Sequence, residues 1–86
     1  MKYQLMIERR AQKALVKISQ PHQDRLIEAV QSLAVDPRPS GAKKLAGRDG
    51  WRVRIGDYRI IYEIHDDQLL VLVVSVGHRR EVYNRS

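Results

Sequence analysis

Apolar and polar side chains alternate along residues 51–55, and the alternation resumes after Gly56-Asp57 over residues 58–60, followed by the apolar Ile61 and Tyr62. Two such segments joined by a two-residue turn predict an antiparallel β-hairpin. A two-residue turn also sets which residues face each other. The predicted pairs are Ile55 with Tyr58, Arg54 with Arg59, Val53 with Ile60, Arg52 with Ile61 and Trp51 with Tyr62.

This pairing sorts the hairpin into two faces, because side chains alternate across a strand. The apolar face is expected in the core and consists of Trp51, Val53, Ile55, Tyr58, Ile60 and Tyr62. The other face carries Arg52, Arg54 and Arg59, and we expect it to be left open. Like charges directly opposite each other, as Arg54 and Arg59 would be, are destabilising. We therefore expect the arginine face to bind an anion.

Apolar residues at helical spacing predict two helices before the hairpin. In the first helix Ala11, Ala14, Leu15 and Ile18 form the apolar stripe, with Arg9, Arg10, Lys13 and Lys17 towards solvent. In the second helix the stripe is Leu26, Ile27, Val30, Leu33 and Ala34. Pro21 is tolerated in the first turn of that helix, and the segment from Asp36 to Gly41 ends it.

Three further segments complete the predicted topology. Residues 3–7 alternate like a first strand, and Lys43 to Leu45 are expected in a loop. Leu69 to Val76 is apolar on both faces, which is typical of a central strand, and Gly77 is expected to end it. The order β-α-α-β-β-β predicts a single α+β domain over residues 1–86. Its four-stranded, mostly antiparallel sheet would carry the two N-terminal helices on one face.

The charge balance narrows the classes of partner. The chain has 16 Lys+Arg against 10 Asp+Glu, a net charge of +6. Such a basic chain favours nucleic acid, an anionic membrane surface or an acidic protein as its partner. There is no cysteine, signal-peptide pattern or apolar run long enough to span a bilayer. We therefore expect a cytoplasmic protein without a membrane partner.

The candidate chemistry rests on positive charge. The planar guanidinium group of arginine can donate two hydrogen bonds to the oxygens of a phosphate, and it keeps its charge at physiological pH. A solvated basic face, or an ion-pair network with Glu63 or Asp57, would explain the same arginines. A second basic group is His78-Arg79-Arg80, in which His78 could act as acid or base. Tyr83 could stack on a base or pack the tail, and Lys43, Lys44 and Arg48 are candidate RNA-binding residues. No metal-ligand spacing or nucleotide-binding glycine loop is present, so no metal or cofactor is expected.

These segments resemble the RelE branch of the RelE/ParE toxin superfamily of toxin–antitoxin systems. The resemblance lies in Lys44-Leu45-Ala46-Gly47, in residues 51–62 with their Gly-Asp-Tyr-Arg turn, and in residues 76–83, Val-Gly-His-Arg-Arg-Glu-Val-Tyr. It implies a microbial-ribonuclease-like fold. It also implies a ribosome-dependent endoribonuclease that cleaves mRNA in the A site of the 70S ribosome, beside rRNA. The 2′-hydroxyl would attack the adjacent phosphorus, without metal or cofactor.

The resemblance also implies roles and partners. Arg52 and Arg54 match residues that contact the substrate phosphate and support activation of the 2′-hydroxyl. Arg59 matches the arginine that the family uses to stabilise the transition state. Arg79 or Arg80 matches an arginine on the leaving-group side. Tyr83 matches a tyrosine that stacks on the substrate base. A guanidinium is a poor general base because its pKa exceeds about 12, so His78 or charge alone would activate the hydroxyl. The implied partner is a cognate antitoxin, through which the complex would bind operator DNA.

Two other functions remain open from the sequence. A ParE-like toxin would share the fold, inhibit DNA gyrase and lack nuclease activity; the basic residues and Tyr83 favour the nuclease. A non-catalytic relative would only bind its antitoxin. Arg52 and Arg54, which stand where some members of the family have lysines, favour that last alternative.

Overall fold

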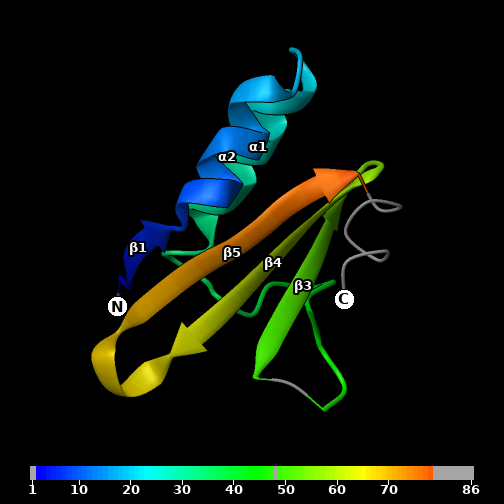
Figure 1. Cartoon of the computed structure of the whole chain (residues 1–86). Coiled ribbons are helices and arrows are strands. Elements are labelled where there is room, and N and C mark those ends of the chain that lie inside the picture. The colour runs from blue at the N-terminus through cyan, green and yellow to red at the C-terminus, as the bar shows by residue number, and fades with distance from the viewer. Residues whose placement is uncertain (1, 48, 79–86) are drawn as a thin grey trace.

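A computed structural model describes residues 2–47 and 49–78. In these residues five strands form one sheet in the order β1-β5-β4-β3-β2 (Figure 1). In chain order the elements are β1 (Gln4–Ile7), α1 (Arg9–Lys17), α2 (His22–Ser32), β2 (Lys43–Lys44), β3 (Gly50–Ile55), β4 (Tyr58–His65), the 3-10 turn η1 (Asp66–Gln68) and β5 (Leu70–His78). β1 pairs with β5 in parallel, and the other pairs are antiparallel. The expected α+β architecture is confirmed.

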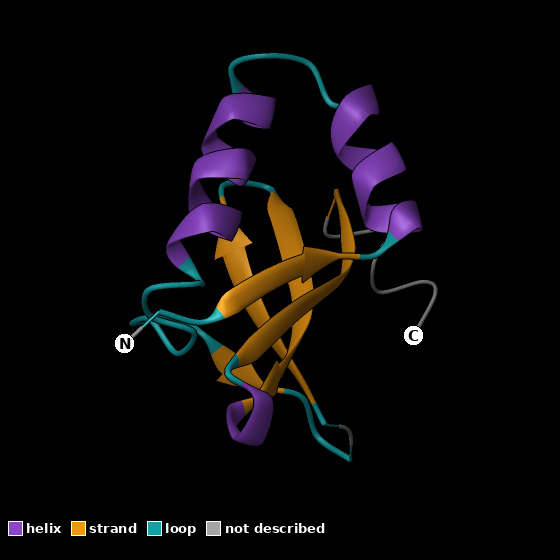
Figure 2. Ribbon diagram, turned by 90° about the vertical axis from the view of Figure 1, so that its left-hand side faces the viewer, coloured by secondary structure: helices purple, strands orange, loops and turns teal. Residues whose placement is uncertain are grey.

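The two helices run antiparallel and stand on the same side of the sheet (Figure 2). Their apolar stripes bury Ala11 and Leu15 from α1, and Leu26 and Val30 from α2. These side chains meet the apolar face of the sheet in one core, which includes Val53, Ile60, Tyr62, Val71, Val73 and Val76. Neither helix among the described residues is long and apolar enough to cross a membrane.

The register predicted for the hairpin is confirmed at every pair from Trp51–Tyr62 to Ile55–Tyr58. Gly56 has a φ of +62° at the first turn position, where a type II′ turn requires glycine. The turn therefore sets the register directly. It brings Arg54 and Arg59 opposite each other on two adjacent strands.

Two details of the predicted sheet were wrong. The sheet has a fifth strand, because Lys43 and Lys44 pair with Arg52 and Trp51 at the edge of β3 instead of lying in a loop. A two-residue edge strand carries too little alternation to be recognised in a sequence. The last strand also continues through Gly77 to His78, because Gly77 pairs with Arg59 and prolongs the ladder with β4.

A β-bulge interrupts the β4–β5 ladder. Ile61 faces Ser75, whereas the next residue, Tyr62, faces Val73. Val74 is therefore an extra residue without an opposite number on β4. A bulge bends and twists the strand that carries it, and the carbonyl of Val74 in this one accepts a hydrogen bond from Arg10 of α1.

A polar cluster joins the start of the chain to the turn between β4 and β5. Asp66 accepts a hydrogen bond of 2.6 Å from the Tyr3 hydroxyl and pairs with Arg38 through two contacts, the shorter of 2.7 Å. The Arg38 guanidinium also lies 5.3 Å from the centre of the Trp51 ring. Hydrogen bonding from Arg38 is the main reason that the pKa of Asp66 falls to about 2.

Beneath this cluster, the buried Tyr62 hydroxyl donates a 2.8 Å hydrogen bond to the carbonyl of Pro37. Burial raises the pKa of Tyr62 to about 12, so the hydroxyl keeps the proton that it donates. The loop after α2 is therefore held to the sheet from the core and from the surface.

The lowered pKa of Asp66 makes part of the stability depend on acid pH. An unfolded aspartate has a pKa of about 3.9, so the stabilisation is present above about pH 4 and is lost as pH falls towards 2. We expect the melting temperature of Asp66→Asn to fall less steeply between pH 5 and pH 2 than that of the wild type. Asp67→Asn is the control, and an identical acid slope in all three proteins would contradict the prediction.

Candidate nucleic-acid interface

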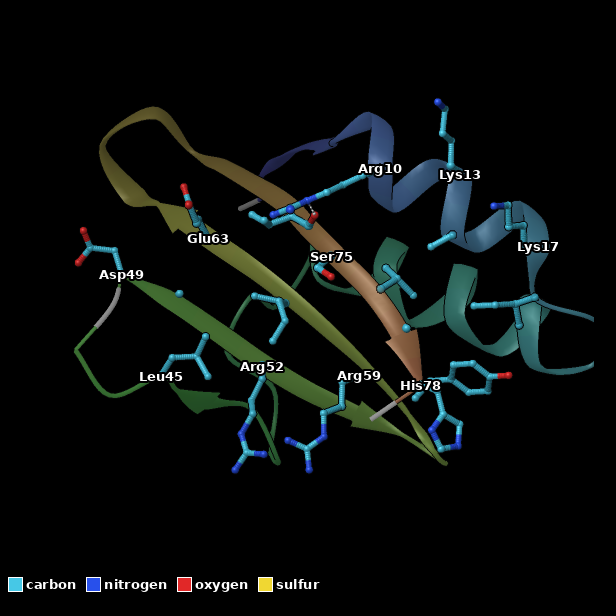
Figure 3. A pocket seen from close by; sticks show the side chains of 18 of the residues that line it. Arg10, Lys13, Lys17, Leu45, Asp49, Arg52, Arg59, Glu63, Ser75 and His78 are labelled. Carbon is cyan, nitrogen blue, oxygen red and sulfur yellow. Dashed lines mark hydrogen bonds between the residues drawn. The ribbon is translucent and has the colours of Figure 1, made fainter. Parts of the chain in front are cut away.

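An open groove of about 1330 Å³ lies between α1 and the arginine face of the sheet (Figure 3). Among the described residues that line it, the basic side chains are Arg10, Lys13, Lys17, Arg52 and Arg59, and the acidic ones are Asp49 and Glu63. The excess of positive charge makes the groove attractive to an anion. Its size suits a chain of anionic groups better than a single ion.

The three arginines of the hairpin share a face but differ in exposure. Arg54 is exposed, Arg52 is partly buried, and Arg59 is only 5% exposed. Figure 3 shows the side chains of Arg52 and Arg59 side by side. Arg54 is not among the residues that line the groove. The arginine face was expected to be open, and for Arg59 this was wrong, because its side chain is buried. It lies between the neighbouring strands β3 and β5, beside Arg52 at the groove.

His78 is the last residue of β5 and lies at one end of the groove. It pairs with Tyr58, so both side chains leave the sheet on the side opposite to Arg59. The rings of Tyr58 and His78 meet edge to face with their centres 5.8 Å apart, and His22 lies 5.5 Å beyond Tyr58. His78 was expected just past the strand end; the structure makes it part of the strand, packed against an aromatic ring.

Glu63 marks the other end of the groove, two residues before the end of β4. Its carboxylate lies 2.9 Å from His65 Nε2, and both side chains are 38% exposed. Glu63 lies opposite Gly50, diagonally across the ladder from Arg52. Along β4 the groove therefore has the basic Arg59 near one end and the acidic Glu63 near the other.

The two candidate RNA-binding lysines lie on different faces of the sheet. Lys43 and Lys44 are both exposed on β2 at the sheet edge, and Lys43 pairs with Arg52 and so shares the arginine face. Lys44 borders a separate pocket of about 270 Å³, together with Arg38 and Trp51, instead of the large groove. Four other candidate site residues lie outside the described residues: Arg48, Arg79, Arg80 and Tyr83.

The sequence reasoning missed the basic wall on α1. Arg10, Lys13 and Lys17 are exposed, as expected, but all three also line the groove. Their spacing of three and four residues places them on one side of the helix. This spacing shows that the three side chains lie together, but not that they lie next to the arginine face. Their position at the groove depends on the packing of α1 against β5, the inner strand that also pairs with β1.

Comparisons with known proteins place this fold in a class of small toxins, the RelE/ParE superfamily. A family model described as ParE toxin of type II toxin–antitoxin system, parDE, matches residues 5–83. The chain belongs to this family, and its likeness to RelE proteins makes it a RelE-like toxin of a type II toxin–antitoxin system.

Individual relatives align over nearly the whole chain. The mRNA interferase toxin RelE of Escherichia coli (strain K12) is 28% identical over 100% of this chain and 95% of its own. A mutant of E. coli toxin RelE in the free state matches with a TM-score of 0.79 and 27% identity, covering 98% of this chain and 93% of that one. The archaeal RelE–RelB complex from Pyrococcus horikoshii OT3 matches with a TM-score of 0.78 and 27% identity, covering 92% and 97%.

The facing arginines should carry a measurable cost in stability. Because Arg54 is exposed and lies opposite the buried Arg59, Arg54→Gln removes a like-charge contact. We expect it to raise the free energy of unfolding by about 0.2–1 kcal/mol in low salt, with the gain shrinking as salt screens the repulsion. Urea unfolding checks this, with the equally exposed Arg25→Gln on α2 as the charge-matched control. Equal effects of the two substitutions would refute the prediction.

Proposed function

We propose that this toxin is an mRNA interferase, a ribosome-dependent endoribonuclease that cleaves mRNA in the A site. The observation that carries the proposal is the groove in which Arg52 and Arg59 lie on adjacent strands, in a chain similar to a protein named mRNA interferase toxin RelE. The enzyme class expected from the sequence agrees with that relative's name. Adjacent guanidinium groups are suited to a phosphodiester and to the extra negative charge of its transition state.

In the proposed reaction the ribose 2′-hydroxyl attacks the adjacent phosphorus, and the bond from phosphorus to the 5′-oxygen breaks. The products are a 2′,3′-cyclic phosphate and a 5′-hydroxyl end. Arg52 and Arg59 hold the phosphate. The attraction between Arg59 and the phosphate is the stronger of the two, because Arg59 is buried in a medium of lower dielectric. Removal of one such preorganised donor typically raises a barrier by about 2.7–4 kcal/mol.

In this proposal the 2′-hydroxyl is activated either by His78 or by the positive charge of the arginines alone, because an arginine does not release its proton near neutral pH. The His78 ring is held at the groove end by its edge-to-face contact with Tyr58. Arg79 or Arg80 would act on the leaving-group side, and Tyr83 would stack on the substrate base. Lys43, Lys44 and Arg48 would contact more distant RNA.

The proposed regulator is a cognate antitoxin with an acidic segment that binds the toxin. Support comes from the P. horikoshii structure, which is a RelE–RelB complex, and from the net charge of +6 of this chain. The complex would bind operator DNA through the antitoxin. The toxin would act in the cytoplasm, where ribosomes translate.

Primer extension on a reporter mRNA in a reconstituted translation reaction tests the proposal. We expect cuts at defined codon positions that need ribosomes and that fall at least about 100-fold with Arg59→Ala. Because Arg59 is buried, Arg59→Lys accompanies it as the variant that keeps the charge, and Arg25→Ala on α2 serves as the control. Circular dichroism confirms that each variant folds.

The same reaction separates the alternatives. Intact mRNA together with inhibited supercoiling by DNA gyrase would place the chain with gyrase-directed toxins. Intact mRNA with unaffected gyrase and normal antitoxin binding would indicate a non-catalytic relative. Rapid cutting of naked RNA would contradict the dependence on ribosomes.

The geometry also ranks two of the arginines. Arg52 lines the groove and is partly buried, whereas Arg54 is exposed beside it. We expect Arg52→Gln to reduce the cleavage rate by about 100-fold or more and Arg54→Gln to reduce it much less. Single-turnover cleavage on programmed ribosomes measures both. A larger loss with Arg54→Gln would mean that the phosphate binds outside the groove.

A further inference from the structure

Arg10 differs from the other basic side chains of α1 because the sheet holds it. Its Nε donates a 3.1 Å hydrogen bond to the carbonyl oxygen of Val74. Val74 is the extra residue of the bulge, without an opposite number on β4. The bulge residue of β5, Val74, is therefore the residue whose carbonyl accepts the hydrogen bond from Arg10.

This anchor leaves the outer end of the guanidinium available. Among the described residues, no hydrogen bond or ion pair occupies the two Nη atoms of Arg10; its nearest acidic contact is Glu8 Oε2, 4.0 Å from Nε. The Arg10 side chain is 71% exposed and lines the groove. Figure 3 shows it reaching from α1 across β5 towards the interior of the groove.

The position of Arg10 places it across the groove from the hairpin arginines. Arg52 faces Ile61, and Ile61 faces Ser75, so these residues form one row across β3, β4 and β5. Val74, which anchors Arg10, is next to the end of that row. Two strand spacings separate the backbones of β3 and β5, roughly 10 Å. Because Arg10 and Arg52 reach into the groove from opposite sides, they suit contacts to different phosphates of one strand better than contacts to a single phosphate.

We propose that Arg10 binds a backbone phosphate of the RNA strand next to the phosphate held by Arg52 and Arg59. The strand is then held from both walls of the groove, with Arg10 on the α1 side. A forked, side-anchored guanidinium is suited to this contact because its planar donors match two phosphate oxygens. The assignment rests on the proposed function of the groove as the RNA site, and it makes Arg10 a binding residue with no role in the bond cleavage itself.

Equilibrium binding of a single-stranded 2′-O-methyl RNA octamer tests this assignment without cleavage, because the attacking hydroxyl is blocked. We expect Arg10→Gln to weaken binding roughly tenfold and to reduce the slope of log affinity against log salt by about 0.7, the value for one lost phosphate contact. Arg10→Lys, which keeps the charge and loses the fork, should give an intermediate affinity.

Arg9→Gln is the matched control, because Arg9 is exposed on the same helix, is absent from the described lining of the groove and carries the same charge. We expect it to change affinity less than about threefold. Thermal unfolding of each variant separates a loss of contact from a loss of fold. If Arg10→Gln does not fold, Arg10→Lys against Arg9→Lys decides the question.

Each outcome has a distinct meaning. Equal losses for Arg10→Gln and Arg9→Gln would show that only overall charge matters and would overturn the assignment, while the groove stayed the RNA site. No octamer binding by the wild type would overturn the assignment of Arg10 as a contact to free RNA, whereas the proposed function is decided by the primer-extension reaction with ribosomes. A loss of antitoxin binding in Arg10→Gln with unchanged octamer binding would make Arg10 a partner contact instead.

Discussion

The short turn at Gly56-Asp57 is the constraint on which the groove depends. Its two residues leave a single register for β3 and β4, which places Arg54 opposite Arg59 and Arg52 one row further along. A one-residue slip would move every side chain of one strand to the opposite face. The same register buries Val53, Ile60 and Tyr62, so the core holds the arginines in place against their mutual repulsion.

The ladder between β4 and β5 adds a second constraint, because its register changes between Ile61 and Tyr62. Before the bulge, β5 places Gly77 opposite Arg59, where no side chain competes for space beside the guanidinium. On both sides of the bulge β5 contributes to the core, with Val76 on one side and Val73 and Val71 on the other. The extra residue therefore keeps all three valines on the core face, and the carbonyl of Val74 accepts the hydrogen bond from Arg10.

Local pattern predicted much of this structure, and non-local packing explains what it missed. The hairpin register and the helix stripes follow from spacing within a dozen residues, so the common face of Arg52, Arg54 and Arg59 could be recognised in the sequence. The place of α1 at the groove depends on strands that pair across more than 60 residues, such as Leu5 with Val71, and Arg59 is buried on a strand whose second neighbour, β5, comes later in the chain. The bulge at Val74 has no signature in an apolar run. The contact of Arg10 with Val74 was therefore missed, although the helix of Arg10 was predicted correctly.

The distribution of charge links stability to binding. Arg59 is costly to bury, because a charge in a low-dielectric setting loses hydration, and Arg54 adds like charge across the strand. An anion in the groove is attracted to these charges, whereas an uncharged ligand of the same shape is not. The same surplus of positive charge suits an RNA strand and an acidic protein segment, because both supply the compensating charge.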